Sequence, residues 1–313
     1  MLVQLASMRD ALAEALLELG ERDMRIVVIG ADTSVSIKTS LFGDKFPDRF
    51  FNVGIAEANM VGIAAGLALA GKVPYVSTYS AFVPGKCLDQ IRNAIAYQKL
   101  NVKIVSSHGG LTVGPDGASH QTVEDVAVMR AVPNLNVVVP ADGPSAKIII
   151  TEAAKIPGPF YIRLARPNVP TVHQSPSDVH IGKAKVLREG SDVTLVGCGI
   201  MVNEAMEAAE MLHKERISAE VIDSHTIKPL DVQTIVKSAR KTGQVVSAEE
   251  ANIIGGLGGA IAEALGENHP TKMLRVGIRD TYGESGEHPE LLAKYGLTSK
   301  EIFRTAKTLL GRG

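Results

Sequence analysis

Tryptophan is absent from this sequence of 313 residues, and aromatic residues together make up only 4% of it. Single-stranded nucleic acids are usually bound by stacked aromatic side chains in a basic groove. The chain has little of either, because its 33 basic and 34 acidic residues leave a net charge of −1. The composition therefore argues against nucleic acid or an anionic membrane surface as a partner.

Cysteines and long apolar runs are also scarce. The two cysteines, Cys87 and Cys198, lack the close spacing of metal ligands, which fits small buried side chains in a reducing compartment. The longest apolar run ends at Gly71, before the roughly 18 residues that a membrane span needs, and residues 1–22 lack a signal-peptide pattern. We therefore expect a cytoplasmic protein without a membrane-spanning segment.

Short β-branched runs alternate with helical patterns along the first half of the chain. Strands are expected at residues 25–29, 102–105, 136–140 and 161–164, with helices between them such as residues 86–100. Strands that alternate with helices usually pair in parallel and are covered by helices on both faces of the sheet. The pattern therefore predicts an α/β fold.

A proline-rich segment interrupts this alternation. Residues 166–176 contain three prolines and no helical period, which is typical of a linker. Strand and helix patterns resume near residue 193. We therefore expect two α/β domains, residues 1–168 and the smaller 185–313, joined by a linker at residues 169–184.

One carboxylate, Glu57, stands in a run of apolar and small residues that extends to Ala70. A buried carboxylate is unfavourable unless it is paired, and loss of water favours its protonated form. The protonated form can donate a hydrogen bond to a heteroaromatic nitrogen. A glutamate in the first turn of a helix also interacts favourably with the helix dipole, so the pattern alone leaves both roles open.

A glycine- and proline-rich loop at residues 107–121 carries a second group of polar side chains. It contains His108, Asp116 and His120, which are suited to binding sugar hydroxyls or to relaying protons. The alternative is a surface loop in which Asp116 supports its own turn. The two histidines lack the spacing of a zinc pair, so we predict no metal site in this chain.

Other candidate residues are scattered along the sequence. Arg9 and Arg166 each offer a planar fork of donors that suits phosphate, although either alone could be an ordinary surface residue. Tyr79 and Phe82, just before the predicted helix at 86–100, could clamp a flat heterocycle or simply belong to the core. Ligands of open parallel sheets bind beyond the carboxyl ends of the strands, where we expect Asp32, Glu57, His108 and Arg166.

Taken together, these segments resemble the C-terminal half of transketolase, an enzyme that depends on thiamine diphosphate (ThDP). The resemblance implies a parallel-sheet domain of the ThDP fold that binds the pyrimidine ring, followed by a smaller α/β transketolase C-terminal domain. The matching segments are residues 30–32, 51–57, 114–121, 132–137, 140–143 and 166–170, followed by 223–231 and 283–286.

The resemblance also implies roles for individual residues. Glu57 would hydrogen-bond the aminopyrimidine ring and act catalytically together with His108 and His120. Asp32, Tyr79 and Phe82 would join Glu57 in holding the cofactor. Phosphosugar substrates would be bound by Arg9, Ser36, His108, Asp116, His120 and Arg166.

The sequence departs from the family pattern in three places. Val76 replaces an aromatic residue of the pyrimidine pocket, and Pro115 replaces an acidic residue beside the substrate loop. The family binds the diphosphate and its Mg²⁺ or other divalent cation through a Gly-Asp-Gly motif, which this chain lacks. We therefore expect a split transketolase, in which a separate N-terminal subunit carries the diphosphate and metal site. The subunits would self-associate as a heterotetramer.

This assignment implies transfer of a two-carbon ketol unit from a ketose to an aldose phosphate, as in the pentose phosphate pathway. One alternative is the β subunit of a 2-oxo acid dehydrogenase-type enzyme, which lacks the Asp-Gly-x-x-His-Gln loop found at 116–121. A second is an enzyme like 1-deoxyxylulose 5-phosphate synthase, which usually has no histidine at the place of His108. A third is a non-catalytic binding subunit with the same fold.

Overall fold

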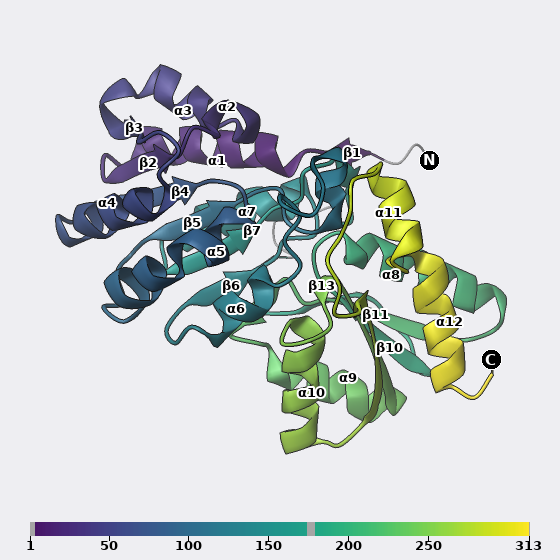
Figure 1. Cartoon of the computed structure of the whole chain (residues 1–313). Coiled ribbons are helices and arrows are strands. Elements are labelled where there is room, and N and C mark those ends of the chain that lie inside the picture. The colour runs from purple at the N-terminus through teal and green to yellow at the C-terminus, as the bar shows by residue number, and fades with distance from the viewer. Residues whose placement is uncertain (1–3, 174–178, 313) are drawn as a thin grey trace.

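The computed structural model describes residues 4–173 and 179–312, and it forms two α/β units that lie against each other (Figure 1). The predicted linker at 169–184 lies partly outside the described residues. None of the described helices is long and apolar enough to cross a membrane.

Seven strands form the sheet of the first unit, in the spatial order β12 (Thr226–Lys228), β6 (Asn136–Val138), β7 (Phe160–Arg163), β5 (Lys103–Ser106), β4 (Val73–Ser77), β2 (Ile26–Gly30) and β3 (Phe50–Asn52). All neighbouring strands run parallel except β12, which pairs antiparallel with β6. The residues of β2, β4, β5 and β7 are buried throughout, as expected when helices cover both faces of a parallel sheet.

Helices cover both faces of this sheet. α1 (Met8–Arg22) and α7 (Gly143–Ala153) pack on one face, and α4 (Glu57–Leu69), α5 (Phe82–Asp89) and α6 (Asp125–Ala131) pack on the other. The connection from β2 to β3 contains the short helices α2 (Ser34–Ile37) and α3 (Ser40–Lys45) and a 3₁₀ turn, Pro47–Arg49. The N-terminal strand β1 (Leu5–Ala6) pairs with β8 (Val169–Pro170).

The second unit is built around five strands, in the spatial order β14 (Lys272–Ile278), β13 (Gln244–Asn252), β10 (Val193–Gly197), β11 (Ala219–Asp223) and β9 (Lys185–Arg188). Only β9 runs antiparallel to its neighbour. α8 (Met201–Lys214) and α12 (Ser299–Leu309) cover one face, and α9 (Val232–Thr242) and α10 (Leu257–Asn268) cover the other. The predicted α/β fold with parallel sheets in both units is confirmed.

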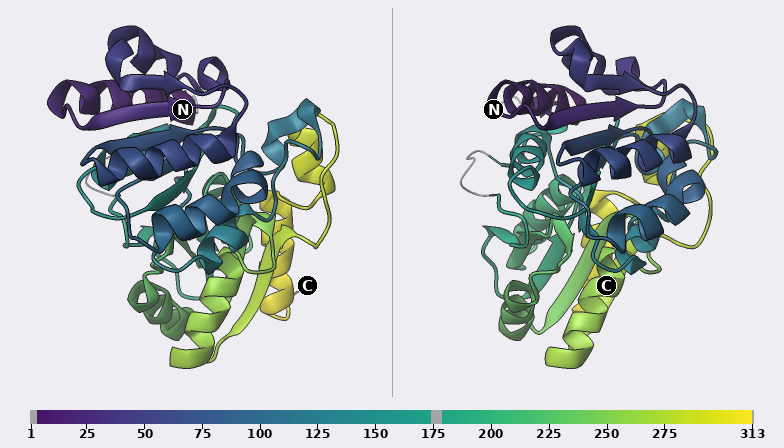
Figure 2. Two further views of the ribbon diagram at one scale, coloured as in Figure 1. Left: turned by 60° about the vertical axis from the view of Figure 1, so that its left-hand side comes forward. Right: turned by 90° about the vertical axis from the view of Figure 1, so that its left-hand side faces the viewer.

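The two units share a β-strand and a hydrophobic cluster. β12 follows β11 of the second sheet in sequence, yet it forms the edge strand of the first sheet. One hydrophobic cluster also runs from Met60 of α4 through Tyr161 of β7 to Leu257 of α10. Figure 2 shows the resulting contact between the blue and green parts of the chain. A boundary drawn near residues 168 to 185 therefore leaves β12, which lies later in the sequence, in the sheet of the first unit.

The predicted strands lie within one residue of the observed starts, but the helix expected at 86–100 begins earlier. α5 starts at Phe82 and continues as a π-helical segment, Gln90–Ala96. Its first turn forms because the amide of Phe82 donates to the carbonyl of Tyr79 at 3.0 Å. Pro84 does not prevent this earlier start, because a proline is tolerated in the first turn of a helix. Cys87 and Cys198 are buried free thiols, as predicted.

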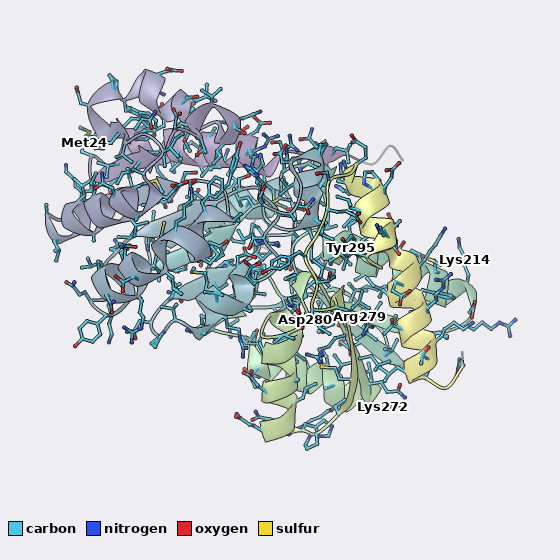
Figure 3. All side chains as sticks on the ribbon, in the orientation of Figure 1. Met24, Lys214, Lys272, Arg279, Asp280 and Tyr295 are labelled. Carbon is cyan, nitrogen blue, oxygen red and sulfur yellow. The ribbon has the colours of Figure 1, made fainter. Side chains whose placement is uncertain are left out.

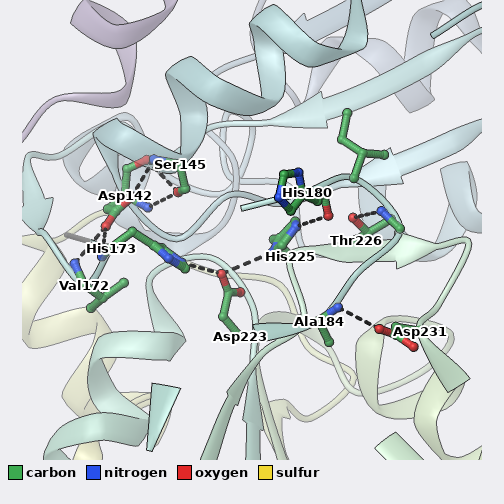
Figure 4. Close-up of polar contacts among 12 residues, drawn as sticks. Asp142, Ser145, Val172, His173, His180, Ala184, Asp223, His225, Thr226 and Asp231 are labelled. Carbon is green, nitrogen blue, oxygen red and sulfur yellow. Dashed lines mark hydrogen bonds and ion pairs between the residues drawn. The ribbon is translucent and has the colours of Figure 1, made fainter. Parts of the chain in front are cut away.

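The buried carboxylate of Asp142 fixes the segment that leaves the first unit (Figure 4). One oxygen caps α7 by accepting from the amide of Ser145 at 2.8 Å. The other accepts from the amides of Val172 at 2.7 Å and His173 at 2.8 Å. A single side chain therefore holds both the start of α7 and the path of residues 172 and 173.

His173 continues this network into the second unit. Its Nε2 lies 2.7 Å from Asp223 Oδ2 at the end of β11, and Nδ1 of His225 lies 3.2 Å from the same oxygen. Burial raises the pKa of Asp223, but the positive charge and hydrogen bonds of His225 and His173 outweigh burial and hold it below its ordinary value. The two units are therefore joined by a buried, charge-assisted cluster.

We predict that Asp142→Ala lowers the free energy of unfolding by about 3–5 kcal/mol. The change removes a helix N-cap worth about 1 kcal/mol and leaves the partly buried N–H of Val172 and the buried N–H of His173 unpaired, at about 1–2 kcal/mol each. Asp142→Ser keeps an N-cap but cannot reach Val172 and His173, so its effect should be intermediate. Urea unfolding at fixed protein concentration measures both, and an Asp142→Ala variant as stable as the wild type would contradict the prediction.

Candidate active site

Glu57 is the first residue of α4, and its side chain is only 3% exposed. Among the described residues, its one hydrogen-bond or ion-pair partner is Lys86 of α5. The ammonium of Lys86 donates to Glu57 Oε1 at 2.9 Å. The carboxylate therefore lies at the positive end of the α4 dipole and is also paired with a cation.

Lys86 also lies over the ring of Phe82, one of four aromatic rings that cluster here from α5, the β4–α5 connection and the loop after β5. The ring centroids of Tyr79 and Phe82 are 5.8 Å apart. His108 stacks on Tyr79 with centroids 4.1 Å apart, and His120 meets Phe82 edge-on at 5.5 Å. The structure thus brings together four of the residues that the sequence singled out.

His108 lies in the left-handed region, with φ of 61°, and its side chain is buried. Its Nδ1 lies 3.1 Å from the hydroxyl of Ser107. Burial lowers the pKa of His108 to about 3, and the positive charges of Arg9 and Arg166 add to the shift. The imidazole is therefore neutral near pH 7, so it can donate or accept a hydrogen bond but does not contribute positive charge.

The two arginines that act on this histidine are held by contacts with different segments. Arg9 Nη1 donates to the carbonyl of Ser36 at 2.9 Å, whereas Arg166 donates to the carbonyl of Val113 and lies 4.0 Å from Asp116. Nε of Arg9 is buried and has no acceptor within the described part of the chain. A buried donor without a partner fits a site for an anionic oxygen.

The remaining predicted residues lie around the same edge of the sheet. The hydroxyl of Tyr79 is 2.9 Å from that of Ser36, whose carbonyl accepts from Arg9, so Ser36 links the ring cluster to Arg9. Asp32 follows β2 and is exposed, and its described hydrogen bonds are with Asn52 at the end of β3. It belongs to the carboxyl edge of the sheet but makes no described contact with the rings.

The loop that carries the two histidines rests on the second unit. Glu250 of β13 accepts from the amide of Thr112 at 2.7 Å, and its carbonyl accepts from Arg163 at 2.9 Å. A Cβ on Gly110 would lie 2.3 Å from the Glu250 carboxyl group, so only glycine allows this approach. Gly110 also has φ of 78°, which is readily accessible only to glycine.

Gln121, a buried residue at the end of the loop, joins it to the segment between β14 and α11 (His288–Lys294). Its Nε2 donates to the carbonyl of Gly114 at 3.0 Å and to that of Glu284 at 2.9 Å. Tyr295 supports the same segment from beyond α11, because its hydroxyl donates to the carbonyl of Tyr282 at 3.2 Å. Figure 3 labels Tyr295 together with Arg279 and Asp280, where the segment begins.

Sequence reasoning missed three residues of this arrangement: Lys86, Gln121 and Glu250. Gln121 was noted only as part of a motif, and Glu250 is far away in the sequence. Lys86 carried one usable signal, its four-residue spacing from Phe82, which places both on one face of a helix. Within residues 4–173 and 179–312, no three His, Cys, Asp or Glu side chains are grouped so that they could hold a metal ion.

Comparison with known proteins identifies the family. Residues 4–172 match the transketolase pyrimidine-binding domain, and residues 182–302 match the transketolase C-terminal domain. Together these matches define the pyrimidine-binding and C-terminal parts of a transketolase-type enzyme. The chain therefore belongs to the transketolase family, as the C-terminal part of a split enzyme of the transferase class.

Relatives of similar length support this assignment. A putative transketolase C-terminal section of Methanocaldococcus jannaschii is 46% identical, over 95% of this chain and 94% of the relative. A 6-deoxy-6-sulfo-D-fructose transketolase subunit of Clostridium sp. is 44% identical, over 97% and 95%. A solved split-gene transketolase, an inactive β4 tetramer, is 48% identical with a TM-score of 0.90, covering 98% of both chains. The predicted family and fold are confirmed.

We predict that Gln121→Ala loosens the histidine loop without unfolding the protein. Loss of two hydrogen bonds, at about 1 kcal/mol each, should raise amide exchange about tenfold or more in residues 107–121 and 280–288. Hydrogen–deuterium exchange measures this directly, with α1 as the internal reference. Tyr295→Phe, the matched control, should affect only residues 280–288. Unchanged exchange at 107–121 in Gln121→Ala would show that Gln121 does not hold the loop.

Proposed function

We propose that this chain is the C-terminal subunit of a ThDP-dependent transketolase that transfers a two-carbon ketol unit between phosphosugars. The observation that carries the proposal is the buried Glu57 carboxylate at the start of α4, which Lys86 links to the ring cluster of Tyr79, Phe82, His108 and His120. When bound, ThDP supplies the carbanion chemistry that a protein side chain cannot provide.

The residues present fit the pyrimidine end of ThDP. Glu57 would hydrogen-bond the ring nitrogen of the aminopyrimidine, while Tyr79 and Phe82 would hold its faces by offset stacking. Asp32 would lie toward the thiazolium end. The support for these roles is the burial of Glu57 and the 5.8 Å separation of the two aromatic rings.

The other side of the site fits a sugar with an anionic end. Arg9, Ser36 and Arg166 would bind the terminal phosphate, and the unpaired Nε of Arg9 supports an oxygen acceptor there. His108, neutral at pH 7, would hydrogen-bond substrate oxygens, and His120 would assist proton transfer. Asp116 would accept a hydrogen bond from a sugar hydroxyl.

A second chain would complete the site. The sequence has no Gly-Asp-Gly motif, so an N-terminal subunit would hold the diphosphate and its Mg²⁺ or other divalent cation. The exposed side of α4 supports such an interface, because Gly62 and Gly66 present no side chain there and Ile55 is 77% exposed. Self-association of the pairs would give a heterotetramer, and the β4 tetramer of the solved relative supports self-association of this type of subunit.

The relatives that match along their whole length are named as transketolase subunits or sections, which favours this function over the two other ThDP enzymes considered above. One of them is named for 6-deoxy-6-sulfo-D-fructose, whose terminal anion is a sulfonate. Two arginines would bind a sulfonate or a phosphate by similar hydrogen bonds. The substrate assay therefore includes both a phosphosugar and a sulfosugar donor.

We predict that Glu57→Ala abolishes ketol transfer in the complex with the N-terminal subunit. The expected loss is about 10³-fold or more, because the variant lacks the group that exchanges a proton with the aminopyrimidine. The measurement is transfer from xylulose 5-phosphate to ribose 5-phosphate with ThDP and magnesium, beside size-exclusion chromatography of the complex. Glu267→Ala, on the exposed side of α10, is the matched control and should retain wild-type transfer.

Two outcomes would contradict the proposal. Wild-type turnover in Glu57→Ala would remove Glu57 from the chemistry. Turnover of 2-oxo acids, with no transfer from either a phosphosugar or a sulfosugar donor, would favour the 2-oxo acid dehydrogenase-type alternative.

A further inference from the structure

Lys86 contacts two of the three groups that are proposed to hold the pyrimidine ring, Glu57 and Phe82. Its Nζ lies 2.9 Å from Glu57 Oε1 and 4.1 Å from the centroid of the Phe82 ring. Phe82 and Lys86 are four residues apart on α5, so both side chains project from the same face of the helix. The ammonium therefore bridges an acidic group on α4 and an aromatic face on α5.

The two ends of this ion pair differ in their exposure. The side chain of Glu57 is 3% exposed, whereas that of Lys86 is 46% exposed. The carboxylate has no other hydrogen-bond partner in the described ranges, so removal of the ammonium would leave a buried charge uncompensated. Lys86 itself can reach water, because its flexible stem allows the strongly hydrated ammonium to swing outward.

A flat ring that hydrogen-bonds to Glu57 and stacks on Phe82 needs the same two contacts. A hydrogen bond places a ring nitrogen about 2.9 Å from the carboxylate oxygen, and stacking places the ring about 3.5–4 Å above its neighbour. The Lys86 ammonium already occupies both kinds of contact, at 2.9 Å and 4.1 Å. The ring and the ammonium therefore compete for Glu57 and Phe82.

We propose that Lys86 is a positioning residue that neutralises Glu57 in the cofactor-free subunit and is displaced when the aminopyrimidine ring binds. The displacement rests on the function proposed above, whereas the pairing of Lys86 with Glu57 does not. Before assembly, the ion pair holds the glutamate side chain in place at the start of α4. Afterwards, the outward movement of Lys86 leaves the carboxyl group to take up a proton from water and donate a hydrogen bond to the ring nitrogen.

The pairing is tested in the isolated chain by a double-mutant cycle. At pH 8, Lys86→Met should lower the melting temperature because Glu57 loses its partner, and the same change should have no effect in a Glu57→Gln background. Lys237→Met, an exposed lysine-to-methionine change in the middle of α9, is the matched control and should act equally in both backgrounds. Equal effects of Lys86→Met in both backgrounds would overturn the pairing.

The displacement is tested by calorimetric titration of ThDP into the complex with the N-terminal subunit. Lys86→Met should bind ThDP about two- to fivefold more tightly than the wild type, in the range that a half-exposed ion pair supplies, whereas Lys86→Arg should restore wild-type affinity. Unchanged or weaker binding by Lys86→Met would overturn the displacement. If the wild-type complex failed to bind ThDP, the proposed function and the displacement would both fail, while the cycle would still decide the pairing.

Discussion

The whole site depends on how the second unit is joined to the first. β12 completes the sheet of the first unit, and the Asp142–His173–Asp223 cluster holds the connection next to it. This junction brings Glu250 and the segment near Glu284 into contact with a loop that follows β5. The positions of His108 and His120 are therefore set by contacts from residues more than 100 positions later in the sequence.

The electrostatics divide the site into two ends. At one end, a buried carboxylate on α4 meets an aromatic cluster and is neutralised by a lysine that can move away. At the other, the positive charges of two arginines act on a buried histidine whose pKa of about 3 keeps it uncharged. A heteroaromatic base fits the first end and the oxygens of an anionic sugar fit the second. The ring cluster connects them, because Tyr79 contacts both His108 and Ser36.

Local patterns in the sequence predicted much of this arrangement. The apolar run around Glu57 correctly predicted a helix that starts there, α4. The β-branched runs correctly predicted the strands that are followed by Asp32, His108 and Arg166. The predicted start of α5 at Lys86 was wrong. The helix begins at Phe82, because Pro84 is tolerated in its first turn. The pairing of Lys86 with Glu57, the support from Gln121 and Glu250, and the transfer of β12 between sheets depend on contacts between distant segments. No local periodicity reports such contacts.

The central claim is that this chain contributes one half of an active site. The most direct measurement is ketol transfer from xylulose 5-phosphate to ribose 5-phosphate, with ThDP and magnesium, by three samples: this chain alone, its N-terminal partner alone, and an equimolar mixture. The account predicts transfer in the mixture and none in either subunit by itself. Transfer by this chain alone would contradict it, because the chain would then have to hold the diphosphate and its metal without the partner.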